Sequence, residues 1–337
     1  MLKDLKELCT AFGPSGNEDE VRDLIIKKTE KYADSITEDK VGNLIVFKKG
    51  KKRRDKKVMY SSHMDEVGFM IRHFGEDGYL YFGAIGGISR AVAGGRRLVI
   101  GDNRLPGIIS AKAIHLQKQS ERGVCIPIEE MYINIGCDTD KQAKEYVSLG
   151  DTAVFEPNYE DFGDGLVKSK ALDDRAGCTV LIDMIKSGPE YDTWFAFTCC
   201  EEIGTRGAAV ASHETDADVV ITVEATTAAD IGGVPKEKQC CAIREGAVIS
   251  HMDNGTIYDK GLFALSQKIA KENGIKYQIK NLVAGGNDSS AFQKGADGAR
   301  VLAVSLPARY IHTACSVIAK EDLFSVRDLA VKLNENI

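Results

Sequence analysis

Short apolar runs along the chain predict buried β-strands. A run of about four to eight apolar residues, bounded by polar or turn residues, is typical of a strand covered on both faces. Four such runs occur: KVMYSS (Lys57–Ser62), TWFAFTCC (Thr193–Cys200), DVVITV (Asp218–Val223) and RVLAVSL (Arg300–Leu306).

Helical patterns alternate with these runs. The apolar spacing predicts helices over residues 18–32, 173–187, 259–274 and 320–335. The second of these segments opens on Asp173, a natural N-cap, and the third ends on Gly274, a C-cap signal. Strands alternating with helices predict an α/β fold with a mostly parallel sheet and helices on both faces.

A different pattern fills residues 69–162. This segment is rich in glycine and in short β-type runs such as YLYFGAIGG and GIISAKAIHL, and it has no convincing long helix. We expect a small β-rich domain inserted into the α/β domain. The α/β domain would then be discontinuous, comprising residues 1–68 and 163–337.

Composition narrows the class of protein. The chain has 337 residues, of which 43% are hydrophobic and 28% charged, and this balance is typical of a soluble globular protein. The net charge of −6 argues against nucleic acid as a partner. The chain has no apolar run of membrane-spanning length, and its start, MLKDLKELCTAFGPSG, lacks the apolar core of a signal peptide. We therefore expect a cytoplasmic protein without a membrane partner.

Two other conspicuous features have ordinary explanations. The nine cysteines include no C-x-x-C pair, and the adjacent pairs Cys199/Cys200 and Cys240/Cys241 are poorly spaced to chelate one zinc ion. We expect them to be reduced, buried side chains. The basic run KKGKKRRDKK (residues 48–57) lies between two strand-like runs, which favours a hairpin tip or an edge loop.

Histidines and carboxylates gather at the ends of the predicted strands. His63, Asp65 and Glu66 follow the first run, Glu201 and Glu202 the second, Glu224 the third and His312 the fourth, while Asp173 opens a helix. Ligands of open α/β sheets bind at the carboxyl ends of the strands. We therefore expect these side chains to converge at one rim of the sheet.

The set favours a metal site, although each member alone has a simpler reading. A single His is commonly a surface or capping group, an Asp a helix cap, and a Glu pair a solvated turn. Two His with several carboxylates suit zinc, cobalt or manganese. A metal-assisted hydrolase needs one carboxylate to hold the ion and another to move a proton, so we expect Glu201 and Glu202 to divide these roles. Two metals about 3.5–4 Å apart would hold a water between them.

Several motifs carry a family resemblance. SSHMDEVGFM, KALDDRAGC, CCEEIGTRGA, VEATTAADIGG and LPARYIHT, in this order, resemble the M42 family of metallo-aminopeptidases. The opening AFGPSGNEDEVRDLI and the late GGNDSSAFQKG fit the same pattern, so the resemblance covers essentially the whole chain. The family includes tetrahedral and glutamyl aminopeptidases, and some members are named endoglucanases.

The resemblance implies an architecture and a set of roles. The fold would be an α/β peptidase domain with an inserted PDZ-like β-barrel for oligomerisation, and dimers would assemble into a tetrahedral dodecamer. Each subunit would hold two divalent ions, zinc or alternatively cobalt or manganese, and would act on short peptides. The implied roles are His63 and Glu224 as ligands of one metal, Glu202 and His312 as ligands of the other, Asp173 as the bridge, Asp65 as the residue orienting His63, and Glu201 as the general base activating a metal-bridging water.

Three positions depart from the family pattern, and alternatives stay open. Glu224 stands where the family more often has Asp, HTACS follows the last histidine, and GGNDSS replaces a more usual GGTDA. These departures bear on substrate preference and on the metal. The alternatives are a metal-dependent deacylase on the same fold, a glycosidase using paired carboxylates, a non-catalytic binding subunit and a thiol redox protein.

Overall fold

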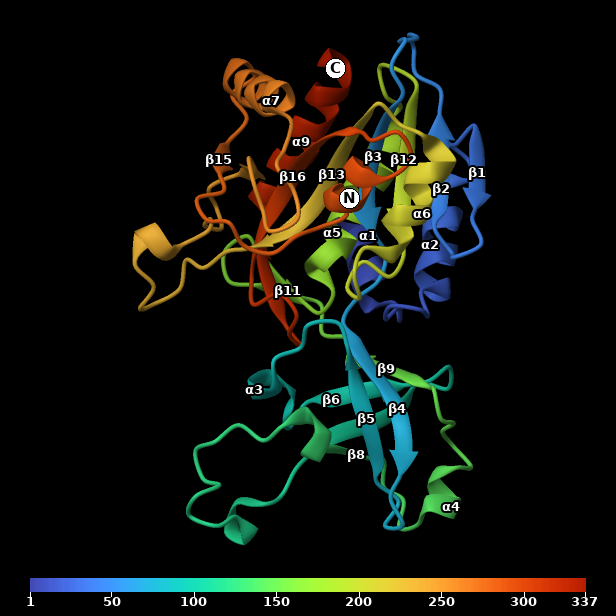
Figure 1. Cartoon of the computed structure of the whole chain (residues 1–337), viewed down its shortest axis with the longest axis vertical. Coiled ribbons are helices and arrows are strands. Elements are labelled where there is room, and N and C mark those ends of the chain that lie inside the picture. The colour runs from blue at the N-terminus through green and yellow to red at the C-terminus, as the bar shows by residue number, and fades with distance from the viewer.

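The chain forms a larger α/β body and a smaller β-barrel (Figure 1). The computed structural model describes residues 1–337. The chain passes into the barrel from a central strand of the α/β body and later returns to it, and both termini lie in that body. None of the helices is long and apolar enough to span a lipid bilayer.

An 11-stranded sheet is the core of the α/β body. Its main path, in spatial order, is β1 (Ser35–Glu38), β2 (Leu44–Lys48), β12 (Thr193–Thr198), β3 (Val58–His63), β13 (Val219–Thr227), β16 (Arg300–Arg309), β17 (Ser316–Ala319), β11 (Leu166–Ser169) and β10 (Glu160–Phe162). Two further strands, β14 (Ala247–Ile249) and β15 (Tyr277–Ile279), join it beside β16. The central strands β12, β3, β13 and β16 run parallel to one another.

Helices cover both faces of this sheet, as predicted. Along β13, Val219 and Ile221 pack into one large core, whereas Val220 between them packs into a second core on the other face. This alternation is the two-residue period of a strand. The first core includes residues of α1 (Leu2–Thr10), α2 (Asp19–Thr29), α5 (Leu172–Ser187), α7 (Lys260–Glu272) and α9 (Lys320–Asn336), and the second includes residues of α6 (Arg206–Thr215) and α8 (Ser289–Lys294).

The expectation of a mostly parallel sheet is right for the centre and wrong for the flanks. The pairs β1–β2, β16–β17 and β10–β11 are antiparallel, and so are β2–β12 and β11–β17. Short turns connect the first three pairs, and a short turn can join only antiparallel strands. Strands such as β10, whose residues are all exposed, also lack the apolar run that marks the central strands.

The barrel is closed and has its own core. Its strands, in order around the barrel, are β4 (Gly68–Phe74), β5 (Leu80–Ile85), β8 (Tyr132–Asn134), β7 (Leu105–Ser110), β6 (Arg97–Ile100) and β9 (Thr152–Phe155). Phe69 lies at its centre, with the rings of Phe82 and Phe155 packed edge-on at 5.0 and 5.4 Å. Two short helices, α3 (Arg90–Ala93) and α4 (Asp140–Ala143), flank the strands, and single 3₁₀ turns lie at Ile114–Leu116, Ile128–Glu130 and, in the α/β body, Lys236–Lys238.

The basic run at residues 48–57 is not a hairpin tip. It connects β2 to β3, and β12 lies between these two strands in the sheet. The run is therefore a loop that crosses the end of β12. Lys51 and Lys52 pair there with Glu190, and Arg53 pairs with Asp192, so part of its charge is neutralised within the chain.

Candidate metal centre

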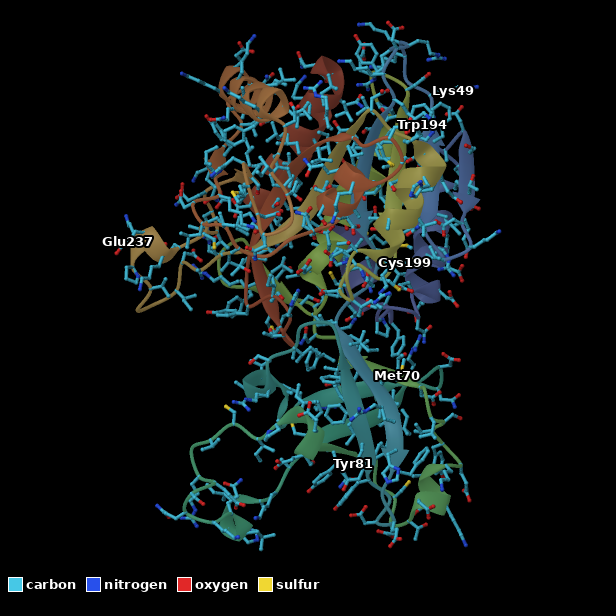
Figure 2. All side chains as sticks on the ribbon, viewed as in Figure 1. Lys49, Met70, Tyr81, Trp194, Cys199 and Glu237 are labelled. Atoms are coloured by element: carbon cyan, nitrogen blue, oxygen red, sulfur yellow. The ribbon has the colours of Figure 1, made fainter.

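The candidate residues lie where the central strands end, at the junction with the barrel. Figure 2 shows Trp194 and Cys199 toward opposite ends of β12, with Cys199 nearer the barrel. The neighbouring strand β3 ends at His63, and the chain then enters the barrel at β4. The carboxyl ends of the parallel strands thus face the barrel, as the convergence of the predicted residues requires.

Asp173 faces two histidines, one with each carboxylate oxygen. Its Oδ1 lies 3.2 Å from Nε2 of His63, and its Oδ2 lies 3.4 Å from Nε2 of His312. The histidines come from different parts of the fold, since His63 ends β3 and His312 lies in the loop between β16 and β17. Asp173 therefore occupies the middle of the group.

Each histidine also has a carboxylate partner of its own. Oε1 of Glu224 lies 3.3 Å from Nε2 of His63, and Oε2 of Glu202 lies 3.2 Å from Nε2 of His312. Donor atoms within 4.8 Å of one another occur in the set His63, Asp173 and Glu202 and again in the set His63, Asp174 and Glu224, so His63 borders both parts of the acidic group. The group thus has two halves, one on each side of Asp173.

Asp65 fastens the two strand ends together. Its Oδ1 lies 3.4 Å from Nδ1 of His63, on the side of the ring away from Asp173. Its Oδ1 accepts a hydrogen bond from the backbone N–H of Glu201 (3.0 Å) and its Oδ2 accepts one from the N–H of Glu202 (3.1 Å). Ser15 donates a further bond of 2.6 Å to Oδ2. One buried carboxylate therefore sets the positions of a histidine and of both glutamates.

The sequence predicted Asp173 as the cap of this helix, but the capping residue is Asp174. Oδ1 of Asp174 accepts from the backbone N–H of Gly177 at 3.0 Å, and its side chain also bonds to Ser62. Both aspartates have non-helical backbone angles at the start of α5. Because Asp174 satisfies the helix terminus, the carboxylate of Asp173 is left to face the histidines.

The barrel side contributes one contact to the group. Nδ1 of His312 lies 3.2 Å from the carbonyl oxygen of Gly87, in the segment between β5 and α3. A Cβ atom at the neighbouring Gly86, which has a φ of +77°, would lie 3.3 Å from Cβ of Glu202. This segment therefore closes the group from the side opposite the sheet.

Burial and crowding perturb the carboxyl groups strongly. Burial, together with the charge of Asp173, raises the pKa of Glu202 to about 8 and that of Glu224 to about 7. Burial also raises the pKa of Glu201 well above its usual range. Burial opposes ionisation of Asp173 as well, but hydrogen bonds from both histidines hold the pKa of that carboxyl well below its usual value. A cation would relieve the repulsion among these groups.

The pKa values of the two histidines are also raised, but by the neighbouring carboxylates and against the effect of burial. Burial disfavours the charged form of His312, but its hydrogen bond with Asp173 and the charges of Asp173 and Glu202 raise its pKa to about 9. The pKa of His63 is also raised. Burial lowers it, but the charge of Glu224 and the hydrogen bonds to Asp173 and Asp65 outweigh that effect. Both shifts favour the protonated rings, whose positive charge balances part of the charge of the surrounding carboxylates.

Sequence reasoning missed a buried acidic group beside the centre. Asp288 accepts from Oγ1 of Thr198 at 2.5 Å, its Oδ1 has no partner, and burial raises its pKa to about 6. Asp288 is the acidic residue of the GGNDSS segment, and no local pattern in the sequence marks it as buried.

Glu66, which the sequence placed among the converging side chains, instead anchors a buried ion network. Oε1 and Oε2 of Glu66 accept from Nζ of Lys170 at 2.7 and 2.9 Å, and Oε1 also lies 3.3 Å from Nη2 of Arg175. Lys170 donates to the carbonyl of Ala11 as well, and Arg175 to those of Leu8 and Gly13. The network ties the N-terminal segment to the start of α5. The only signal in the sequence was the position of Glu66 beside Asp65.

The cysteines of the adjacent pairs are packing residues for the most part. Cys199, Cys240 and Cys241 are buried and Cys200 is partly exposed, and all four are free thiols. Cys199 donates to the carbonyl of Val41 at 3.1 Å. Cys199 and Cys200 approach Glu18, but they lie outside the group that joins the two histidines.

Comparison with known proteins identifies the family. The sequence profile of the M42 glutamyl aminopeptidases matches residues 42–329. A provisionally named aminopeptidase of Acetivibrio thermocellus is 34% identical over 98% of both chains. The TET1 peptidase of Pyrococcus horikoshii, whose structure forms a tetrahedron or a large octahedral shell, is 30% identical, with a TM-score of 0.88 over 100% of this chain and 99% of its own. A structure from Thermotoga maritima named an endoglucanase is 33% identical, with a TM-score of 0.81 over 98% of each chain.

The profile covers well over half of the chain, and the relatives match it from end to end. The observed α/β body with a six-stranded barrel agrees with this assignment. The chain belongs to the M42 peptidase family and is a hydrolase of peptide bonds, an aminopeptidase.

Proposed function

We propose that this protein is a dinuclear metal-dependent aminopeptidase that removes N-terminal residues from short peptides. The observation that carries the proposal is the position of Asp173, which offers one oxygen to each of two histidines. A bridging carboxylate between two half-sites is what a pair of divalent ions requires.

The residues present fit two cations. The donors are imidazole nitrogens and carboxylate oxygens, which suit zinc and also cobalt or manganese. Oε2 of Glu224 is buried without a hydrogen-bond partner, an arrangement that costs free energy unless another group satisfies it. We propose His63, Asp173 and Glu224 as ligands of one ion, and His312, Glu202 and Asp173 as ligands of the other.

The metals would supply Lewis acidity, polarising the scissile carbonyl and lowering the pKa of the attacking water. Glu201 lines the same cleft as His63, Asp173 and Glu224. We assign it the role of general base, which takes a proton from the water and passes it to the leaving amine. Asp65 would keep the ring of His63 in the tautomer that presents Nε2 to the site.

Two alternative activities remain to be separated by assay. The endoglucanase name of the Thermotoga relative favours testing a glycosidase, and the shared fold favours testing a deacylase. A two-carboxylate glycosidase has no need of His63 and His312, and it should work in the presence of a chelator. Cellulosic substrates, N-acyl amino acids and aminoacyl p-nitroanilides, each with and without EDTA, would distinguish the three.

The proposal is tested by replacing Glu201 with Gln. The variant should keep its fold and about two metal ions per chain, measured by elemental analysis, but lose roughly 10²–10⁴-fold in kcat on peptide substrates. EDTA should abolish the wild-type activity. Glu237, an exposed residue distant from the centre (Figure 2), provides the control Glu237→Gln, which should behave as wild type. Near-normal activity of Glu201→Gln, or one metal per chain at saturation, would contradict the proposal.

We further propose a homo-oligomer, with a tetrahedral dodecamer as the specific form. The support is the assembly described for the TET1 peptidase, which matches this chain over its whole length. We assign the barrel, and with it the inserted segment 69–162 of the predicted domain division, to this assembly. Its likeness to a PDZ domain and a cytoplasmic location stay predictions. Light scattering at defined protein concentration would test the subunit number.

A further inference from the structure

Two adjacent thiols and a buried carboxylate meet outside the candidate metal centre. The Sγ atoms of Cys199 and Cys200 and a carboxylate oxygen of Glu18 all lie within 4.8 Å of one another. These residues come from distant parts of the sequence, since Glu18 directly precedes α2 and the cysteines follow β12. The group includes none of the residues that we propose as ligands of the catalytic metals.

The backbone at Cys200 explains how neighbouring cysteines can face one ion. Adjacent residues of an extended strand point to opposite faces, so their side chains cannot normally share a ligand. However, β12 ends at Thr198, and Cys200 has a φ of +54°, in the left-handed region. Both sulfur atoms thereby come within reach of Glu18. The objection from sequence spacing therefore does not apply to this pair.

Glu18 is a buried carboxylate with one oxygen left unbonded. It is 4% exposed, and no lysine or arginine pairs with it. The backbone N–H groups of Gly16 and Cys200 donate to Oε1 at 2.9 and 3.0 Å, and Sγ of Cys200 lies 3.6 Å from the same atom. All of the hydrogen bonds to this side chain thus end on Oε1, and Oε2 receives none.

Other buried carboxylates away from the catalytic centre are fully bonded. Oδ1 of Asp39 accepts from three backbone N–H groups, and its Oδ2 accepts from the side chain of Asn43. The two oxygens of Asp322 accept from the N–H groups of Arg244 and Gly246. Since buried charges are normally paired or bound to a metal, a free oxygen beside two thiols indicates a missing cation.

The donors fit a cation that prefers sulfur. Cys200 is partly exposed, which gives an ion a path from solvent, whereas Cys199 and Glu18 are buried. Two thiolates and a carboxylate suit zinc and softer divalent ions, with the fourth tetrahedral position left for water. Binding would release both thiol protons to solvent and replace the weak S–H bond from Cys199 to the carbonyl of Val41.

We propose that Glu18, Cys199 and Cys200 form a further metal site that binds one zinc or softer divalent ion. The ion would join the start of α2 to the end of β12 and so fix the residues directly before Glu201. The site shares no ligand with the proposed catalytic centre, so it is independent of the dinuclear mechanism.

Cadmium absorbance tests the site directly. The catalytic centre is first filled with Mn²⁺, which prefers oxygen and nitrogen ligands, and the reduced enzyme is then titrated with CdCl₂. Only thiolate ligands give a sulfur-to-cadmium charge-transfer band in the ultraviolet, and the proposed catalytic ligands include no sulfur. We expect a saturable band in the wild-type enzyme and its loss in the double variant Cys199→Ala/Cys200→Ala.

Further variants separate this site from the other cysteines. Glu18→Gln keeps both thiols but should weaken cadmium binding at least about 10-fold, because loss of even an outer-shell partner of a metal ligand costs roughly 10–100-fold. Cys125→Ala removes an exposed thiol, and Cys240→Ala/Cys241→Ala removes the other adjacent pair. Both of these should keep the wild-type band.

Thermal melting provides a second readout. An ion that binds only the folded chain stabilises it, so CdCl₂ should raise the melting temperature of the wild-type enzyme more than that of Cys199→Ala/Cys200→Ala. Melting without cadmium shows whether each variant is folded. Cys200→Ser changes a single partly exposed atom and should also lose most of the band, so the test does not depend on the stability of the double variant.

Three outcomes would overturn the proposal. The first is the absence of a band in wild-type enzyme whose nine thiols titrate as reduced. The second is a band that persists in folded Cys199→Ala/Cys200→Ala or Cys200→Ser. The third is unchanged cadmium affinity in Glu18→Gln, which would remove the carboxylate from the site.

Discussion

Replacing Glu66 with Gln should destabilise the protein more than replacing Lys170 with Met, although both changes break the same buried ion pair. The network holds two cations and one anion, since Lys170 and Arg175 share Glu66. Their side chains are 1%, 0% and 3% exposed, so water screens none of them. The two substitutions therefore leave very different charge states behind.

The expected magnitudes follow from what each variant leaves in the interior. In Glu66→Gln, Lys170 and Arg175 remain as two buried cations with no anion, and breaking a buried pair in this way costs about 3–5 kcal/mol. In Lys170→Met, Glu66 still pairs with Arg175, and the main loss is the donor to Glu66 and to Ala11. Lost hydrogen bonds of this kind cost about 1–3 kcal/mol. Burial also lowers the pKa of Lys170, so Lys170 loses its proton more readily than Arg175 does.

Urea unfolding measures the difference. Trp194 is the single tryptophan and reports on the sheet by fluorescence, while circular dichroism at 222 nm reports on the helices. Protein concentration and metal content must be held equal, because both oligomerisation and bound metal stabilise the folded state. Glu237→Gln and Lys271→Met serve as exposed controls of the same chemistry. Equal losses in the two buried variants, or a larger loss in Lys170→Met, would refute the charge argument.

Two more predictions concern the cysteine pair and an ion pair at α7. Changing Cys199 and Cys200 together to Ala should leave kcat/KM within about threefold of wild type and cost about 1–2 kcal/mol of stability through the cavity at buried Cys199. Complete loss of activity with normal folding and metal content would revive a thiol role. Asp259 caps α7 and pairs with Arg300, whose hydrogen bond lowers the pKa of Asp259 to about 2. A carboxyl group whose pKa is lowered in the folded state stabilises the fold at pH values above its unfolded pKa of 3.8, and this contribution is lost as the pH falls toward 2. Asp259→Asn should therefore lower the free energy of unfolding by about 0.5–1 kcal/mol at pH 7 and by less at pH 3. Urea midpoints at the two pH values measure the difference. A cost that does not shrink at pH 3 would contradict this assignment.

The sequence predicted the elements that have a strong periodic signal. The central strands stand out as apolar runs because both faces are covered, and the polar residues that follow them converge because parallel strands end at one rim. Strands β1 and β10 were missed because their residues are largely exposed, and β11 and β17 because a run of four residues is too short to stand out.

The residues that the sequence left unexplained depend on contacts between distant segments. Lys170 and Lys280 resemble ordinary surface lysines in sequence, and only the folded chain shows that both are buried. Asp173 and Asp174 are adjacent and chemically identical, so the sequence could not tell which one caps the helix. Their roles diverge through the backbone angles at the start of α5.

Because of the contact between His312 and Gly87, the geometry of the proposed metal centre depends on the orientation of the barrel. Because the carbonyl of Gly87 holds the ring of His312, a rigid-body rotation of the barrel would move a proposed ligand relative to Glu202 and Asp173. Any neighbour that favours one barrel orientation would then change the affinity for metal, and metal would change the affinity for that neighbour by the same factor. Subunit assembly and metal loading would be linked equilibria, and each could be titrated by varying the other.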